Sequence, residues 1–148
     1  MKIFVDANVP IYAAGREHPL KEPSKEVLRI AAARPQDIFT DAEVLQELLH
    51  RYLSLRMWPA GKAAVRAFAD VMRGSVEAVR AEDVERAVEL ADGHFPELSA
   101  RDLLHAAVML RVGTQSVVTA DKSFDRLARE GIERLDPSGV ESWKESLA

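Results

Sequence analysis

Four acidic residues in this 148-residue chain lie at places where folding can bring them together. Asp6 and Asp121 each come just after an apolar run that reads as a β-strand, Glu47 lies two turns into an expected helix, and Asp102 lies in the first turn of another. Carboxylates that converge repel one another unless cations neutralise them. An all-oxygen cluster of this kind suits Mg²⁺ or Mn²⁺.

The elements that must position these acids alternate along the chain. Apolar runs predict strands at 2–5, 38–40, 76–79, 116–119 and 132–135. Spacing and end signals predict helices at 8–15, 24–34, 40–56, 59–74, 82–92, 100–110 and 121–131, with a last helix in the tail. This alternation predicts a single α/β domain over 1–148, with a short, mostly parallel central sheet of four to five strands flanked by helices. Ligands of such sheets bind beyond the carboxyl ends of the strands.

Ordinary structural roles also explain several of these residues. Asp102 completes an S-x-x-D capping pattern from Ser99, and Asp121 can cap the helix that follows it. Asp6 is less well explained as a cap, because Asn8 can cap the next helix itself.

Glu43, Glu47 and Asp125 also have ordinary structural explanations. A T-x-x-E pattern predicts a capping box between Thr40 and Glu43. The helical wheel places Glu47 opposite the apolar half of its helix, as expected for a solvated surface residue. Asp125 lies four residues before Arg129, which suits an exposed ion pair.

Composition excludes several classes of protein. The chain has no cysteine, so it has no disulfides, iron–sulfur cluster, Cys-based zinc site or cysteine nucleophile. Its net charge of −4 argues against coating nucleic acid by bulk electrostatics. Setting the four acids aside leaves 20 acids against 20 Lys and Arg, so the charge can equally indicate one cation site. No signal or spanning segment is evident, and we expect a cytoplasmic protein with no membrane partner.

Among the four histidines, only His105 has a notable position. It lies three residues after Asp102, and a D-x-x-H pair can bind metal. Its apolar neighbours favour a packed, hydrogen-bonded histidine instead.

The four segments together resemble the PIN domain, most closely the stand-alone toxins of the VapC type. The resemblance covers nearly the whole chain. Its motifs are similar to VDANVPIY with Asp6, TDAEVLQE with Glu47, RDLLHAA with Asp102, and VVTADKSFDRL with Asp121. Four motifs in this order and spacing are more specific than any one alone.

The resemblance implies that Asp6, Glu47, Asp102 and Asp121 bind Mg²⁺ or Mn²⁺ and carry catalysis in a ribonuclease. A bound divalent ion polarises the phosphate and lowers the pKa of its water. Cleavage then leaves a 5′-phosphate and a 3′-hydroxyl. Many relatives carry a further acid where this chain has Ser123, which leaves the number of metals open.

Other residues around these motifs are weaker candidates. Supporting roles in orienting water or a carboxylate are open to Asn8, Thr119 and Asp125, whereas phosphate contacts are open to Arg16, Arg101, Lys122 and Arg126.

The resemblance also implies a cognate antitoxin and a homodimer. Leu53, Leu55, Met57 and Trp58 lie at a helix–helix junction, where they form either an exposed patch for such contacts or ordinary core.

Two other functions stay open at this point. One is a PIN-fold interaction module without catalysis. The other is a phosphotransfer or phosphatase-like domain with Asp6 as nucleophile, because VDAN at a strand end is superficially similar to haloacid-dehalogenase-type phosphatases. Thr40 and Lys122 would then be the further candidates.

Overall fold

Five short strands form one sheet in the order β3-β2-β1-β4-β5, and every pairing is parallel. The computed structural model describes residues 2–147. The strands are β1 Ile3–Val5, β2 Ile38–Asp41, β3 Val76–Glu77, β4 Ser116–Val118 and β5 Glu133–Leu135. The prediction of an α/β fold with a mostly parallel sheet is confirmed, with five strands and no antiparallel pair among the described residues.

The strand order reverses between β1 and β4. From β1 the chain builds outward through β2 to β3, and it then returns to place β4 and β5 on the other side of β1. In open parallel sheets a ligand crevice forms beyond the strand ends at such a reversal. Val5 of β1 pairs with Val118 of β4, so the residues that follow these two strands meet at this crevice.

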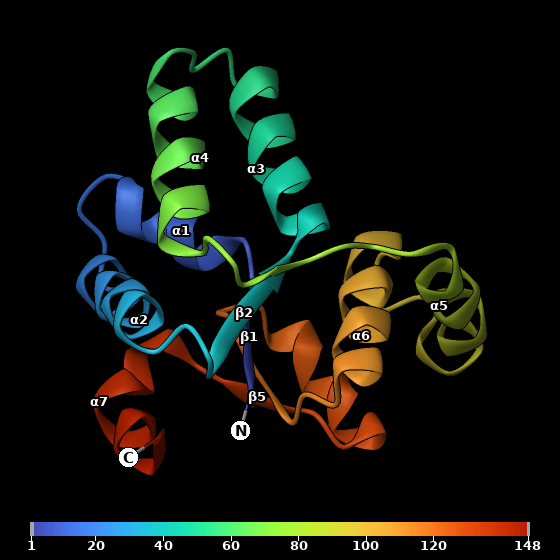
Figure 1. Cartoon of the computed structure of the whole chain (residues 1–148). Coiled ribbons are helices and arrows are strands. Elements are labelled where there is room, and N and C mark those ends of the chain that lie inside the picture. The colour runs from blue at the N-terminus through green and yellow to red at the C-terminus, as the bar shows by residue number, and fades with distance from the viewer. Residues whose placement is uncertain (1, 148) are drawn as a thin grey trace.

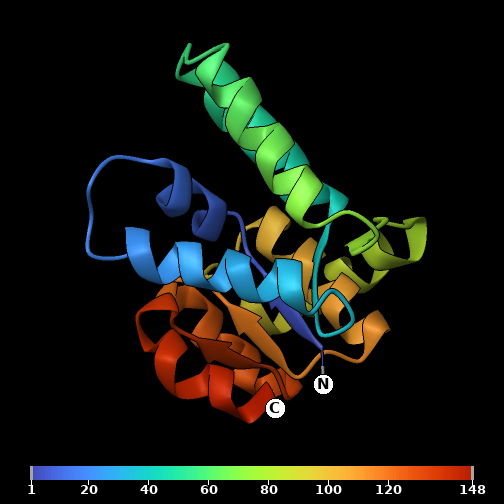
Figure 2. The same ribbon diagram turned by 60° about the vertical axis from the view of Figure 1, so that its left-hand side comes forward.

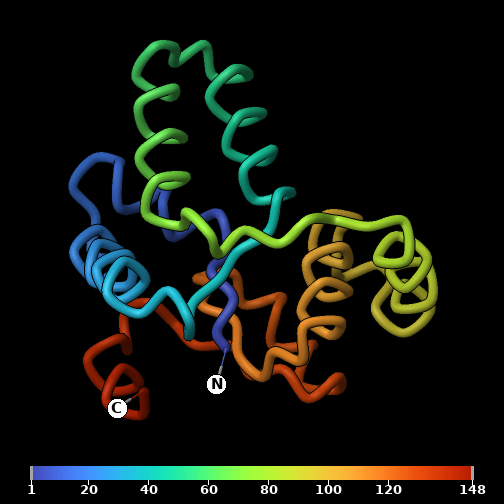
Figure 3. The backbone as a smooth tube through the Cα atoms, in the orientation of Figure 1, coloured from blue at the N-terminus to red at the C-terminus, as the bar shows by residue number. Residues whose placement is uncertain are grey.

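Helices cover both faces of the sheet. Figure 1 shows α2 and α7 on one side and α5 and α6 on the other, and the backbone trace of Figure 3 follows the same layers. The helices are α1 Asn8–Ala14, α2 Lys21–Ala33, α3 Ala42–Ser54, α4 Ala60–Val71, α5 Ala81–His94, α6 Ala100–Val112 and α7 Val140–Trp143. The described residues also include three short 3₁₀ segments, η1 Lys122–Glu130, η2 Pro137–Gly139 and η3 Lys144–Leu147.

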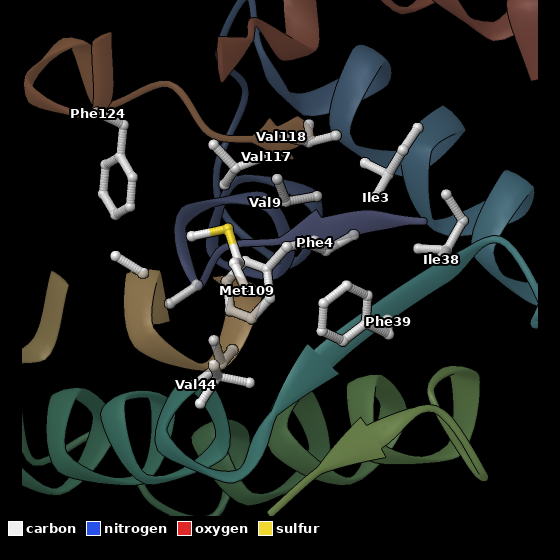
Figure 4. Close-up of a cluster of buried hydrophobic side chains, with 14 of the residues drawn as sticks. Ile3, Phe4, Val9, Ile38, Phe39, Val44, Met109, Val117, Val118 and Phe124 are labelled. Carbon is white, nitrogen blue, oxygen red and sulfur yellow. The ribbon is translucent and has the colours of Figure 1, made fainter. Parts of the chain in front are cut away.

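The central strand β1 lies in the core over its whole length, with Ile3, Phe4 and Val5 fully buried. Figure 4 shows side chains from the strands meeting Val44 of α3 and Met109 of α6. Burial on both faces explains why these strands read as continuous apolar runs.

Helices α3 and α4 form a hairpin that projects from the body, which Figure 2 shows in profile. The two helices approach closely at Gly61, where an added Cβ would lie 2.3 Å from Cβ of Tyr52. Leu53 and Leu55, toward the hairpin tip, are about half exposed, as are Met57 and Trp58. These four residues, named here the hairpin-tip patch, are therefore surface rather than core.

Three local predictions are wrong. Helix α2 begins at Lys21 and not at Ser24. Pro23 is tolerated in its first turn, because the backbone N–H groups of a first turn have no partner within the helix and the missing N–H of proline costs nothing there. The capping box at Thr40 is absent; Asp41 caps α3 by accepting a hydrogen bond from the Val44 N–H, while Thr40 Oγ1 donates to the Val5 carbonyl.

The third wrong prediction concerns regular helix near the C-terminus. Residues 122–130 form a 3₁₀ segment, and the tail forms three short turns in place of one helix. Within residues 2–147, no helix is both long and apolar enough to cross a membrane.

Candidate metal centre

Asp6 lies at the strand-order reversal, directly after β1, and is 6% exposed. Its Oδ1 accepts a hydrogen bond from the Ala7 N–H at 2.8 Å. Its Oδ2 accepts from Thr119 Oγ1 at 2.7 Å and from Asn8 Nδ2 at 3.2 Å. Three donors therefore fix this carboxylate in one orientation.

Asn8 and Thr119 act together in holding it. Asn8 Nδ2 also donates to Thr119 Oγ1 at 2.7 Å, and Asn8 Oδ1 accepts from the Ala120 N–H at 3.1 Å. Asn8 does not cap α1. The N-cap of α1 is Ala7, and no side chain makes a capping hydrogen bond there. The two polar residues instead connect the ends of β1 and β4.

Glu47 reaches the same place from the second turn of α3. Its Oε1 lies 3.6 Å from His105 Nε2 and 3.7 Å from Arg101 Nε, and its side chain is 24% exposed. The prediction of a solvated surface residue is wrong. The helical wheel fails because α3 projects from the body, which leaves Leu49 and Leu53 on its apolar half exposed.

His105 lies on α6 and is fully buried. Its Nδ1 lies 2.8 Å from Oδ2 of Asp41, which is also fully buried. The packed, hydrogen-bonded histidine expected from its neighbours is confirmed. Sequence reasoning missed Asp41 as a site residue, although its position at the end of β2 was the available signal.

Asp6, Glu47 and His105 form a group in which each residue offers one ligand atom and all these atoms lie within 4.8 Å of one another. We name this group the inner cluster. Burial raises the pKa of Asp6 to about 6; His105 and Thr119 oppose the rise, and the negative charge of Glu47 adds to it. A group that resists ionisation here gains most from a bound cation.

His105 carries the opposite perturbation. Burial lowers its pKa, but the hydrogen bond to Asp41, the interaction with Glu47 and the charges of Asp41 and Asp6 outweigh burial and raise the pKa to about 10. The carboxylates therefore stabilise positive charge at the ring, whether that charge is a proton or a metal ion.

Asp102 and Asp121 lie outside the inner cluster and are named here the outer acids. Asp102 forms the expected capping box with Ser99, accepting from the Ser99 N–H at 3.2 Å. Burial raises the pKa of Asp102, the bonds to Ser99 oppose this, and the charge of Asp121 adds to the rise. Asp121 caps η1, as its Oδ1 accepts from the Ser123 N–H and hydroxyl. The two carboxylates thus repel each other across the crevice rim.

The candidate phosphate ligands differ in what they already contact. Arg101 lies within 3.4 Å of Glu43 and 3.7 Å of Glu47. Arg126 donates to the Gly93 carbonyl and lies 3.6 Å from a Glu97 oxygen. These two guanidinium groups are engaged with the protein itself.

Arg16 and Lys122 have no ion pair or side-chain hydrogen bond to any residue in 2–147. Asp125 does not pair with Arg129; its Oδ1 accepts from Arg134 Nε at 2.7 Å, outside the inner cluster. The 3₁₀ geometry of η1 removes the i,i+4 relation on which the expected pair depended.

Comparison with known proteins gives a consistent family. The PIN domain family matches residues 3–130. Ribonuclease VapC13 of Mycobacterium tuberculosis is 38% identical over 133 residues, covering 90% of this chain and 98% of that protein. Ribonuclease VapC23 of the same species is 40% identical over 126 residues, covering 83% and 92%.

Solved structures share the fold. VapC20 of Mycobacterium tuberculosis, described as a sarcin–ricin loop cleaving toxin, superposes with a TM-score of 0.68 at 26% identity, covering 84% of this chain and 94% of that one. A VapBC2 complex from Rickettsia felis superposes with a TM-score of 0.71 at 16% identity, covering 92% and 98%. The chain therefore belongs to the PIN domain family, in the group that contains the VapC ribonucleases.

Proposed function

We propose that this protein is a metal-dependent endoribonuclease that hydrolyses RNA phosphodiester bonds as the toxin of a toxin–antitoxin pair. One observation carries the proposal: the inner cluster gathers ligand atoms of Asp6, Glu47 and His105 within 4.8 Å at the strand-order reversal. The ribonuclease names of relatives at 38–40% identity support the choice of reaction.

The residues present fit a divalent cation. Two carboxylates converge in a largely buried place, and the adjacent His105 Nε2 is buried without a hydrogen-bond partner in the described part of the chain. Asp6 and Glu47 would hold the ion from the inside. Asp102 and Asp121 would bind it directly or through water. Mg²⁺ or Mn²⁺ held there would supply the Lewis-acid chemistry, polarising the scissile phosphate and lowering the pKa of water.

The protein's own groups do the positioning. Thr119 and Asn8 donate to Oδ2 of Asp6, so this carboxylate needs little reordering when the cation binds. Arg101 balances the charge of Glu47 and Glu43 at the mouth of the site. Lys122 and Arg16, which have no ion pair within residues 2–147, are the cations we assign to an incoming phosphate.

The phosphatase-like alternative loses its main support. Its second candidate, Thr40, is fully buried and its hydroxyl is committed to the Val5 carbonyl at 2.9 Å. Asp6 is likewise enclosed by three donors rather than presented to a substrate phosphorus.

An antitoxin and a second copy of the chain are the partners we propose. The neighbours include toxin–antitoxin assemblies, VapBC2 of Rickettsia felis and VapBC-1 of nontypeable Haemophilus influenzae. The hairpin-tip patch of Leu53, Leu55, Met57 and Trp58 is the surface we assign to such contacts. A cytoplasmic location, where RNA is available, belongs to the same proposal.

The test is cleavage of a defined RNA by the purified protein with its metals controlled. Chelation should abolish cleavage, and adding back Mg²⁺ or Mn²⁺ should restore it. The products should carry a 5′-phosphate and a 3′-hydroxyl. Cleavage that survives chelation, or products with a 2′,3′-cyclic phosphate, would contradict the metal-activated water. RNA binding without cleavage under any metal would favour an interaction module.

A further inference from the structure

The two ring nitrogens of His105 have opposite environments. Nδ1 lies 2.8 Å from a carboxylate oxygen of Asp41. Nε2 is buried and has no hydrogen-bond partner among residues 2–147, although it points toward two acids. It lies 3.6 Å from Glu47 Oε1 and 4.0 Å from Asp6 Oδ1. Both gaps are too long for a hydrogen bond.

Those gaps suit a shared ion. Ligand atoms that each lie about 2.1 Å from one metal are about 3.0–4.2 Å apart, depending on the angle between them. The separations from Nε2 to Glu47 and to Asp6 both fall in this range. The position between these three atoms is therefore a better place for a cation than for a proton, which would have no acceptor within bonding distance.

Asp41 determines which nitrogen is available. Its Oδ1 accepts from the Val44 N–H at 2.9 Å, which fixes the carboxylate at the start of α3. Its Oδ2 can only accept, so it holds the proton of His105 on Nδ1. The ring of Phe4 packs against the imidazole, with centroids 5.2 Å apart, and limits its rotation. Once its proton is displaced, Nε2 turns its lone pair toward Asp6 and Glu47.

We propose that His105 supplies a nitrogen ligand to the divalent cation through Nε2 and that Asp41 is the positioning residue for it. This inference rests on the proposed function and adds a ligand to its metal site. A buried carboxylate that fixes a metal-binding histidine through its other ring nitrogen is a common arrangement in metalloproteins. When the cation binds, it replaces any proton on Nε2, and that proton is released to solvent.

A nitrogen ligand has a consequence for metal choice. Mg²⁺ binds almost entirely through oxygen, whereas transition metals accept imidazole readily. The site should therefore bind Mn²⁺ more tightly than Mg²⁺, and His105 should account for much of that difference.

The test is pulsed electron paramagnetic resonance on the full-length protein loaded with Mn²⁺, which detects nitrogen nuclei bonded to the metal. Wild type should show ¹⁴N coupling that changes to a ¹⁵N pattern when histidine is labelled with ¹⁵N. His105→Gln should lose the coupling and bind Mn²⁺ at least about 10-fold more weakly, with a smaller loss for Mg²⁺. His94→Gln is the matched control, since His94 is equally buried but pairs with Glu130 elsewhere.

Asp41→Asn tests the positioning role separately. Asparagine is also a good N-cap, so α3 should keep its start. Its amide N–H₂, however, donates toward Nδ1 and shifts the ring proton to Nε2, which blocks ligation. We expect the ¹⁴N coupling to disappear and Mn²⁺ affinity to fall about 10- to 100-fold, with the fold unchanged by circular dichroism.

The outcomes separate this inference from the proposed function. Tight Mn²⁺ binding without histidine coupling, and unchanged in His105→Gln, would overturn the nitrogen ligand and leave the metal-dependent nuclease intact. No Mn²⁺ or Mg²⁺ binding by wild type, with cleavage that resists chelation, would overturn both. Coupling that persists in Asp41→Asn would overturn the role of Asp41.

Discussion

The inner cluster and the outer acids are held in different ways. The bonds that fix the inner cluster connect distant parts of the chain: Thr119 to Asp6, 113 residues apart, and His105 to Asp41, 64 residues apart. The outer acids are held by their own helix starts, Asp102 by Ser99 and Asp121 by Ser123, within three residues. The inner cluster is thus a product of the whole fold, whereas each outer acid also has a local structural role.

This difference predicts that inner substitutions act on chemistry and outer ones on chemistry and helix ends together. A carboxylate with a local role can be present for stability alone. Burying Asp6 costs free energy, as its pKa of about 6 shows, and no helix cap accounts for it. A cost of this kind is typical of functional sites.

The largest effect should come from Asp6→Asn. The change removes a buried ligand charge while keeping the side-chain shape, and it should lower RNA cleavage by about 10³-fold or more. Asp125→Asn is the matched control, because Asp125 lies in an exposed pair with Arg134. It should stay within about twofold of wild type. Equal losses of initial cleavage rate in the two variants would contradict a special role for Asp6.

Two substitutions of Asp102 separate its proposed role in metal binding from its role in capping α6. Asp102→Asn keeps an oxygen acceptor for the Ser99 N–H but removes the charge, so metal affinity should fall about 10- to 100-fold with stability retained. Asp102→Ala should lose the cap as well and cost about a further 1 kcal/mol in the free energy of unfolding. Titration calorimetry measures the metal affinity, and denaturant unfolding measures the free energy of unfolding. Identical values in the two variants would contradict the role of Asp102 as a helix cap.

Thr119→Val tests the network that joins β1 to β4. It leaves Asp6 Oδ2, Asn8 Nδ2 and the Asp121 N–H each short of a partner, and should cost about 1–3 kcal/mol in the free energy of unfolding. Thr114→Val is the control, since Thr114 is buried but its hydroxyl has no partner in residues 2–147. That change should be neutral or stabilising, and a cost equal to that of Thr119→Val would show that the network contributes nothing.

The smallest effect concerns pH. Burial raises the pKa of Asp6 to about 6. The folded protein therefore holds a proton on Asp6 at pH values at which the unfolded chain has already released it. Metal binding needs the ionised form, and the Mn²⁺-induced rise in Tm should shrink as pH falls through about 6. His105 stays protonated or metal-bound across this range, because its pKa is about 10. In Asp6→Asn the part of this pH dependence that comes from Asp6 should be missing, and the part that remains comes from displacing the proton of His105. The same pH dependence in both proteins would contradict the assignment to Asp6.

Sequence reasoning singled out Asp6 and predicted the sheet more readily than it placed the other two residues of the inner cluster, Glu47 and His105. Strand runs and Gly, Pro and Ser signals are local, so the α/β fold and the capping box at Ser99 could be predicted. Glu47 could not be placed by periodicity, because α3 leaves the body and presents apolar residues to solvent. The resemblance to PIN domains alone favoured it.

The pairing of Asp41 with His105 could not be predicted from local patterns for another reason. The pairing of these residues depends on how α6 packs beside the end of β2, 64 positions earlier. A sequence shows that each residue is present but not which ring nitrogen is turned toward Asp6.

The reversal of strand order has a consequence for the order of synthesis. Asp6 and Asn8 emerge from the ribosome more than one hundred residues before Thr119, which is hydrogen-bonded to both. An incomplete chain that ends at α6 contains Asp6, Glu47 and His105 but lacks the strand that aligns Asp6. We therefore expect the carboxylate of Asp6 to take its fixed orientation only after β4 and Thr119 have been synthesised.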